Sequence, residues 1–519
     1  MRFLRYILLL GAPLVFANVT SWWPQRGPYW LGSNFDPSYA YLFNSLLIVN
    51  GEPPFHVDHP GTPVQFLGAA ALSLQCRSAH AARITASTLE QPEEALHTIQ
   101  LAALACTLTS LVLGGWLVAR ECGSIVVGII AQCVPLLFTQ SYLSQIWINA
   151  ETLLFPATFL CSSFTLASVF AESSGRTDRV RIYLIGAAMA AALALTSKVT
   201  YLPFALVPIA AASTCRKKLL TVTTTLVCMG AILFPIRAEL SRMASWFVHL
   251  SSSAVAGAES ASTKVHNLAD SAFTLAKSAP LLPVFILTAL VAGLVLKLYP
   301  RLGTPDRRSG SLLLVAAAAQ LAAITIVAAK PALHYLLPSF VFSSFAAVLI
   351  AKAIPALPRP LAITFTASCV AVFLYGLRSV VGQNQITTSD LAARRVAQLS
   401  AYQFAQTTAT SIRIDYYRSS TPEYALHFGN GYARQHFSPT LQQLHPNAHF
   451  YNIFNANYEQ YSRPEAAPSG DQTSPVCFFG NGEIDTPTYR TKLSLPSNWL
   501  LTRKATIGDY VVHEAHPSP

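Results

Sequence analysis

The stretch Leu281–Leu298, LLPVFILTALVAGLVLKL, contains a single charged residue, Lys297. At 1.5 Å per residue, a helix of this length is roughly 27 Å long, close to the hydrocarbon thickness of a bilayer. No polar face interrupts it, so it is suited to lipid rather than to the surface of a soluble protein. This stretch therefore predicts a transmembrane helix.

Similar apolar stretches recur along the chain of 519 residues, which is 52% hydrophobic and only 11% charged, with a mean hydropathy of +0.41. This composition predicts a mainly α-helical, polytopic membrane protein with about eleven transmembrane helices. The expected spans are 7–22, 98–119, 124–140, 151–170, 182–197, 199–215, 219–236, 281–298, 311–329, 335–352 and 360–377.

The formal charge of +11 does not indicate a nucleic-acid partner, because the basic residues lie mostly between the apolar stretches. The segment 62–75 decides the topology. If it crosses the membrane, three basic clusters face outward against the positive-inside rule, whereas if it lies at the interface all three face the cytoplasm. We therefore expect an interfacial or re-entrant helix at 62–75. The three clusters are Arg176/Arg179/Arg181, Arg216/Lys217/Lys218 and Arg301/Arg307/Arg308.

The N-terminus carries Arg2 and Arg5 before its first apolar stretch, which predicts a cytoplasmic N-terminus. That stretch resembles a signal anchor more than a cleaved signal peptide. With this topology, the loop 23–97 and everything after residue 378 lie outside the plasma membrane. We therefore look for chemistry at the outer, periplasmic or extracellular face, where polar side chains gather.

The tail, 379–519, is polar and aromatic, and its strand-like runs at 411–417 and 509–513 predict a small soluble α/β domain distinct from the membrane domain 1–378. The similar stretches 427–431 and 478–482 could be a repeat or two unrelated turns. Cys76 and Cys477 could form a disulfide, but their positions do not require one.

Asp36 is the most informative residue of the first outer loop. It lies in Asn34-Phe35-Asp36-Pro37-Ser38-Tyr39, directly after the first apolar stretch. A carboxylate beside lipid is costly, which favours a functional role. The alternative is structural, because Asp before Pro is a favoured start of a helix.

The same loop contains Asp58 and a His56-x-x-His59 spacing. These side chains could bind a divalent metal ion, or they could orient an acceptor or shape the loop. Tyr39 and the neighbouring aromatic residues could stack on a sugar, but aromatic residues are also common at membrane interfaces. No cofactor is predicted beyond this possible metal.

Three motifs together resemble the GT-C class of integral membrane glycosyltransferases, which includes protein O-mannosyltransferases and aminoarabinose transferases. They span roughly residues 1–380, and the tail has no counterpart. One departure is Pro37, because many members carry an acidic pair where this chain has Asp36-Pro37. The motifs are Asp36 in the first outer loop, Leu195-Thr196-Ser197-Lys198-Val199-Thr200, and Lys330-Pro331-Ala332-Leu333-His334-Tyr335-Leu336-Leu337-Pro338.

The resemblance implies transfer of a sugar from a polyprenyl-phosphate-linked donor to a glycan, lipid or protein acceptor at the outer face. Asp36 would then be the general base. Cationic side chains would hold the lipid phosphate as it leaves, and further residues would supply a second acid or contact the acceptor. The donor-phosphate candidates are Lys330, His334, Tyr335, Lys198 and Arg237, and the acceptor or second-acid candidates are Glu151, His59, Asp58 and Tyr39.

Several of these candidates have structural alternatives. Lys330 and Arg237 end apolar stretches, where basic side chains commonly extend toward the interface. Glu151 opens a predicted helix, where the helix dipole favours an acid. A secondary transporter or a noncatalytic envelope scaffold would also be polytopic. However, paired repeats are not evident, and a scaffold gives no reason for Asp36, Lys198 and Lys330 to share one face.

Overall fold

The computed structural model describes most of the chain. The described residues are 4–20, 27–31, 35–57, 61–76, 80–255, 261–298, 304–328, 331–353, 359–408, 412–416, 421–452, 457–461, 463–465, 475–481, 490–491, 493–508 and 510–518.

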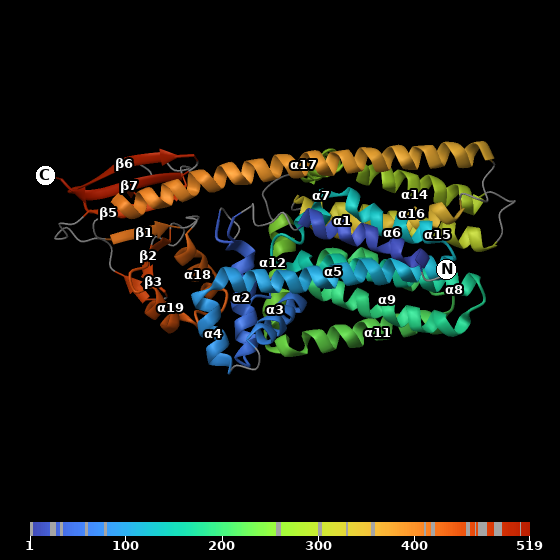
Figure 1. Ribbon diagram of the computed structural model, residues 1–519, viewed down its shortest axis with the longest axis horizontal. Helices are drawn as coiled ribbons and strands as arrows, with labels where there is room; N and C mark the ends of the chain where they lie inside the picture. Colours follow the sequence, from blue (N-terminus) through green and yellow to red (C-terminus); the bar gives the residue numbers. More distant parts are fainter. Residues whose placement is uncertain are drawn as a thin grey trace. The chain divides into compact units, whose positions relative to one another are not determined.

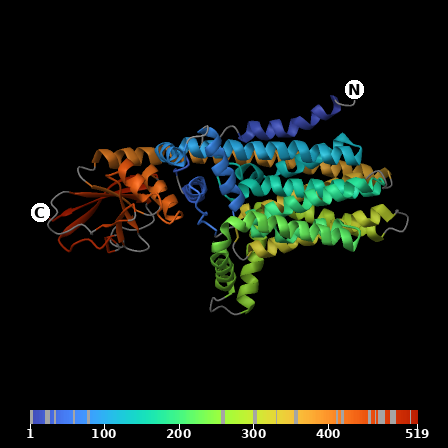
Figure 2. The same cartoon turned by 90° about the horizontal axis from the view of Figure 1, so that it is seen from below.

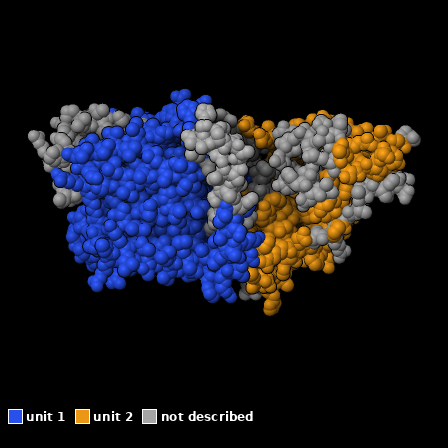
Figure 3. Space-filling model, turned by 180° about the vertical axis from the view of Figure 1, so that it is seen from behind, with its two compact units in different colours: residues 1–21, 57–64, 100–384 blue, residues 22–56, 65–99, 385–519 orange. Residues whose placement is uncertain are grey.

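The chain divides into two compact units, coloured separately in Figure 3. Unit 1 contains residues 1–21, 57–64 and 100–384, and unit 2 contains residues 22–56, 65–99 and 385–519. The predicted division into 1–378 and 379–519 stays a prediction.

Unit 1 is a bundle of helices, as Figure 1 shows. Its apolar runs form helices because every backbone N–H and C=O group must be bonded within a segment that enters lipid. Its elements are η1 Leu4–Leu10, α1 Gly11–Thr20, most of α5 Pro92–Cys122, α6 Ile125–Cys133, η3 Val134–Leu137, α7 Thr139–Leu143, α8 Ala150–Ser173, α9 Thr177–Ser197, η4 Val199–Ala205, α10 Leu206–Ala211, α11 Cys215–Leu233, η5 Phe234–Glu239, α12 Leu240–Val255, α13 Ala261–Ser278, α14 Leu281–Leu298, α15 Thr304–Ala328, η6 Leu333–Leu336, α16 Leu337–Ala353 and the first part of α17 Arg359–Thr408.

Within the described residues, seven helices are long and apolar enough to cross a membrane, and three shorter apolar helices accompany them. The predicted spans coincide with helical segments of the structure. The prediction of a polytopic, mainly helical membrane protein is confirmed. The predicted spans leave residues 237–280 as a connecting segment, and the structure shows that this segment contains the helices α12 and α13, the green pair that stands away from the bundle in Figure 2.

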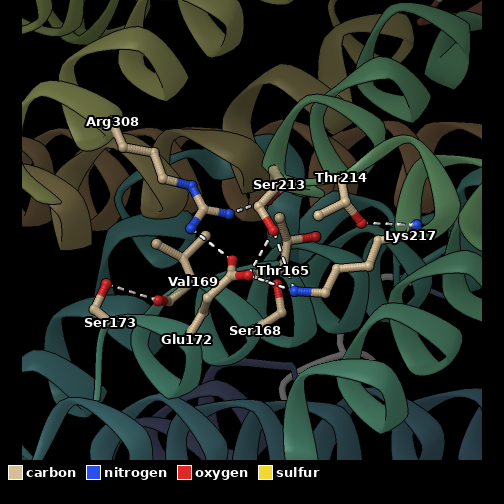
Figure 4. A network of polar contacts seen from close by, with 10 residues as sticks. Thr165, Ser168, Val169, Glu172, Ser173, Ser213, Thr214, Lys217 and Arg308 are labelled. Carbon is tan, nitrogen blue, oxygen red and sulfur yellow. Dashed lines mark hydrogen bonds and ion pairs between the residues drawn. The ribbon is translucent and has the colours of Figure 1, made fainter. Parts of the chain in front are cut away.

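The basic clusters predicted to share one side of the membrane do meet at one end of unit 1. Glu172, in the last turn of α8, accepts hydrogen bonds from Lys217 and from Ser213 (2.5 Å), and lies 2.6 Å from Nη1 of Arg308 (Figure 4). An acid at a helix C-terminus opposes the helix dipole, so this carboxylate is stabilised by tertiary contacts rather than by its own helix. The contacts join the ends of α8, α11 and α15.

Glu121, at the end of α5, makes an equivalent cluster. Its carboxylate lies 3.0 Å from Nη1 of Arg176 and 3.2 Å from Nη1 of Arg179, and it accepts a hydrogen bond from Tyr183 (2.7 Å). Arg176 follows Glu172 closely in the chain, so both acid-centred clusters lie where α8 ends. Both topologies considered for 62–75 place the clusters on one common side, so the interfacial position of 62–75 and the cytoplasmic position of this end stay predictions.

Unit 2 combines a seven-stranded mixed sheet with helices from both ends of the sequence. The strand order is β4-β3-β2-β1-β5-β7-β6, with β1 parallel to β2 and β5 and the other pairs antiparallel. The predicted α/β tail is confirmed. Its strands are β1 Ile412–Tyr416, β2 His449–Asn452, β3 Asn457–Gln460, β4 Arg463–Glu465, β5 Val476–Asn481, β6 Trp499–Ile507 and β7 Tyr510–Pro517, and its helices are α2 Phe35–Val49, most of α3 Thr62–Gln75, α4 Ala81–Glu90, the start of α5, the end of α17, α18 Pro422–Gly431 and α19 Ser438–Leu444.

Helix α18 of the tail packs against α2 of the first predicted outer loop. A Cβ atom at Gly429 would lie 2.6 Å from the Phe43 ring and 2.8 Å from the Tyr39 carbonyl oxygen, so only glycine permits this approach. Asn44 of α2 also donates to the carbonyl oxygen of Tyr432 (3.0 Å). The tail is therefore attached to the helix that carries Asp36.

The two similar stretches of the tail are not a structural repeat. Residues 427–431 lie in the helix α18, whereas 478–481 lie in the strand β5, so neither is simply a turn. Cys76 and Cys477 are both free cysteines in the structure.

His513 makes the sheet sensitive to acid. It lies on β7 opposite Phe478 of β5 and Arg503 of β6, and only 1% of its surface is exposed. Burial lowers the pKa of its imidazole from 6.5 to about 4, and the charge of Arg503 adds to this effect. As the pH falls below the ordinary pKa of histidine, the unfolded chain gains a proton that the folded chain does not. The free energy of unfolding therefore decreases, by up to about 3 kcal/mol, until the pH reaches the pKa of His513 in the folded protein.

We expect His513→Phe to remove this pH dependence. Hydrogen-exchange protection of the β5–β7 peptides, measured between about pH 7 and pH 4.5, would show a flatter profile in the variant than in the wild type. His516→Phe, at a less buried position of the same strand, is the matched control and should keep the wild-type slope. An unchanged slope in His513→Phe would contradict this assignment.

Candidate functional site

Glu151 lies in the first turn of α8, whose start is determined by a reciprocal cap. Asn149 Oδ1 accepts the Thr152 N–H (3.1 Å), and Thr152 Oγ1 accepts the Asn149 N–H (3.0 Å). The helix dipole favours an acid at this position, yet Glu151 is only 2% exposed. A buried carboxylate needs a close cationic partner.

That partner is Lys198. The backbone leaves the helical conformation at this residue, with φ −157° and ψ 135°, between α9 and η4. The preceding carbonyl oxygen, of Ser197, accepts the Gly61 N–H (3.1 Å). The Lys198 side chain is 4% exposed, and its Nζ donates a hydrogen bond to Glu151 Oε1. A buried ion pair in a membrane bundle indicates a functional site, because both charges are expensive to place there.

His334 and Tyr335 complete the group from η6. Lys198 Nζ lies 4.2 Å from the centroid of the Tyr335 ring, a cation–π distance, and His334 Nε2 lies 4.0 Å from Glu151 Oε1. The His334 side chain is 49% exposed. The structure therefore places a buried acid–amine pair against an aromatic ring, with a partly exposed imidazole beside it. Four predicted site residues from three separate segments come together here.

Asp36 lies within the first turn of α2, which begins one residue earlier, at Phe35. The expected alternative, in which Asp36 is the cap and Pro37 the first helical residue, is therefore not the observed arrangement. The Asp36 side chain lies outside the described residues, as do Asp58, His59 and Lys330 entirely. The roles expected for these four residues stay predictions.

Arg237 lies exposed in η5. Its guanidinium carbon is 4.5 Å from the ring centroid of Phe234, and its Nη1 donates to the Phe234 carbonyl oxygen (3.3 Å). These contacts are local and do not connect it to Glu151 or Lys198. Its expected role in phosphate binding stays a prediction.

Tyr39 is completely buried in unit 2. Its hydroxyl donates to Glu93 Oε1 (2.7 Å), and Glu93 Oε2 accepts the Tyr29 N–H (2.7 Å). Burial, reinforced by the Glu93 charge, raises the pKa of Tyr39 well above its ordinary value, so the hydroxyl remains a donor. Sequence reasoning missed Glu93, although the Pro92-Glu93-Glu94 run before a long apolar stretch was a usable signal.

The described residues contain no group of three or more His, Cys, Asp or Glu side chains able to hold a metal ion. His56 is 7% exposed, and its ring makes edge contacts with those of Tyr41 (5.3 Å) and Tyr432 (4.8 Å). A metal role for Asp58 and His59 stays a prediction.

No protein-family model matches the sequence, and no curated protein matches it. Two solved structures do, each over 98% of this chain and 97% of its own length: ArnT from Cupriavidus metallidurans bound to undecaprenyl phosphate, with a TM-score of 0.52 and 11% identity, and the same protein in the apo state, with a TM-score of 0.46 and 12% identity. The fold comparison rests on the first of these two structures, because its TM-score is above 0.5. At this identity the likeness concerns the fold, and it extends over the membrane bundle and the C-terminal tail. The chain therefore has the fold of ArnT, a membrane glycosyltransferase of the GT-C class.

Proposed function

We propose that this protein transfers a sugar from a polyprenyl-phosphate-linked donor to an acceptor at the outer face of the membrane. The observation that carries the proposal is the buried Glu151–Lys198 pair with His334 and Tyr335 beside it, within a GT-C fold. The related fold of ArnT was crystallised with undecaprenyl phosphate, which supports a lipid phosphate as the ligand.

In the proposed reaction, an acceptor oxygen attacks the anomeric carbon of the sugar. The bond from that carbon to the phosphate oxygen breaks, and its electron pair leaves with the lipid phosphate. The phosphate thereby gains one negative charge, which cations in a water-poor site stabilise more strongly than water would. We assign this role to Lys198 and His334, with Lys330 and Arg237 as further candidates.

The acceptor proton must go to a base as the new bond forms. We assign this role to Asp36, on the motif of the first outer loop alone. Glu151 compensates the charge of Lys198 in the resting protein and orients its ammonium group. The topology inferred from the positive-inside rule places the N-terminus in the cytoplasm and the tail 379–519 outside the membrane.

Purified wild-type protein in nanodiscs, supplied with radiolabelled sugars on polyprenyl-phosphate carriers, tests the proposal. We expect transfer from at least one donor, and competition by added undecaprenyl phosphate. If no donor supports transfer and undecaprenyl phosphate does not bind, the proposal is wrong. Uptake of free sugar into proteoliposomes would instead favour a transporter.

A further inference from the structure

We propose that Gln145 is a positioning residue, which holds the first turn of α8 so that Glu151 meets Lys198. The catalytic importance of this role rests on the proposed function, whereas the geometric role does not. Gln145 lies in the turn between α7 and α8 and is 1% exposed.

The side chain of Gln145 connects two helices. Its Oε1 accepts a hydrogen bond from Thr107 Oγ1 of α5 (3.1 Å), and its Nε2 donates to the Thr152 carbonyl oxygen of α8 (3.0 Å). Its own carbonyl oxygen accepts from Gln100 Nε2 of α5 (2.8 Å). Thr152 directly follows Glu151, so this connection reaches the backbone beside the buried acid.

Pro156 explains why the Thr152 carbonyl oxygen is available. In an uninterrupted α-helix, this oxygen would accept the N–H of the residue four positions later, which is Pro156. Proline has no N–H, so the helix leaves this buried acceptor without its usual partner. The amide of Gln145 supplies the missing donor. The first turn of α8 is therefore positioned by α5 as well as by its own helical hydrogen bonds.

The buried Gln145 amide restricts movement of the first turn of α8 relative to α5. Asn149 and Thr152 cap the helix locally, whereas the Gln145 side chain bonds the capped turn to α5. Because an apolar replacement would leave two buried polar groups without this partner, the turn would have to shift or admit water. A shift at Thr152 moves Glu151 relative to Lys198.

Amine labelling of Lys198 measures this position directly. Intact protein in nanodiscs is treated with a small amine-reactive reagent, and modification of Lys198 is followed by mass spectrometry. In the wild type, labelling should be slow because the amine is buried and paired. In Gln145→Leu we expect labelling to rise about tenfold and sugar transfer to fall by about 10- to 100-fold, as for a displaced catalytic group.

Gln132→Leu is the matched control. Gln132 is also fully buried in unit 1, and its Nε2 donates to the carbonyl oxygens of Leu9 in η1 (2.9 Å) and Leu111 in α5 (2.8 Å) rather than to α8. It should lower thermal stability to a similar degree without changing the labelling of Lys198. Equal labelling in the wild type and Gln145→Leu would overturn the proposal.

The double variant Gln145→Leu with Pro156→Ala separates positioning from stability. Alanine restores the N–H for Thr152, so stability should recover in part, but the connection to Thr107 of α5 remains lost and Lys198 labelling should stay high. If labelling returns to the wild-type level, Gln145 only satisfies a carbonyl group and the proposal is wrong.

Gln145→Glu serves if Gln145→Leu does not fold. The protonated glutamic acid side chain can still donate to the Thr152 carbonyl oxygen, whereas the ionised one cannot. The ratio of variant to wild-type labelling of Lys198 should therefore rise with pH. A constant ratio of one would overturn the proposal. Increased labelling in a protein that never transfers sugar would reject the proposed function while supporting the position assigned to Gln145.

Discussion

Lys198→Met is expected to destabilise the protein by about 3 kcal/mol and to lower sugar transfer by at least about 100-fold. The stability loss arises because the buried Glu151 carboxylate loses its ammonium partner. The activity loss is expected because, in the proposed mechanism, Lys198 stabilises the charge of the leaving lipid phosphate. Thermal unfolding in nanodiscs and single-turnover transfer measure the two effects.

A second substitution distinguishes these effects. Adding Glu151→Gln to Lys198→Met removes both buried charges, so stability should largely recover while transfer remains low. Lys217→Met is the matched comparison at the other end of α8, where the ion pair with Glu172 is more exposed, with 26% and 18% of the two side chains accessible. Lys217→Met should destabilise the protein by about 1 kcal/mol or less and leave sugar transfer unchanged. Full transfer by the double variant would remove Lys198 from the proposed mechanism.

Asp36→Asn is expected to lower transfer by about 100- to 10,000-fold, the contribution typical of a general base. Asparagine has nearly the shape of aspartate and can accept the same hydrogen bonds through its amide oxygen, so the unfolding temperature should change little. The binding of undecaprenyl phosphate should also be retained, because the substitution removes only the proton acceptor.

Glu52→Gln is the control for this experiment, because Glu52 is an exposed acid of the same outer loop. It should transfer sugar at the wild-type rate. Full activity of Asp36→Asn, with Glu52→Gln also active, would exclude Asp36 as the base and direct attention to other acids of unit 2, beginning with Glu93.

Local sequence patterns predicted the elements of this fold. Apolar runs predicted the membrane helices, and the segment 62–75 is the helix α3 with the same limits. The strand predicted at 411–417 is β1, and the one at 509–513 opens β7. These features were predictable because hydrophobic length and residue preference act within a short stretch of chain.

Part of the candidate site was predictable for a related reason. Glu151, Lys198 and His334 are ionisable residues at the ends of apolar runs, where a charge requires an explanation. The alternation of helices across the membrane predicted that they share one face, but not that they meet in one group. The local sequence could not predict which charges pair.

The sequence by itself determined the class of the protein and the approximate limits of its apolar helices, and it indicated Glu151, Lys198, His334 and Tyr335 as candidate site residues. Only the tertiary structure decided that Lys198 pairs with Glu151, that α18 packs on α2 through Gly429, and that Gln145 supplies the donor that Pro156 lacks. These contacts join residues far apart in the chain or in separate elements. Their formation depends on which helices become neighbours, a property of packing that no single stretch of sequence contains.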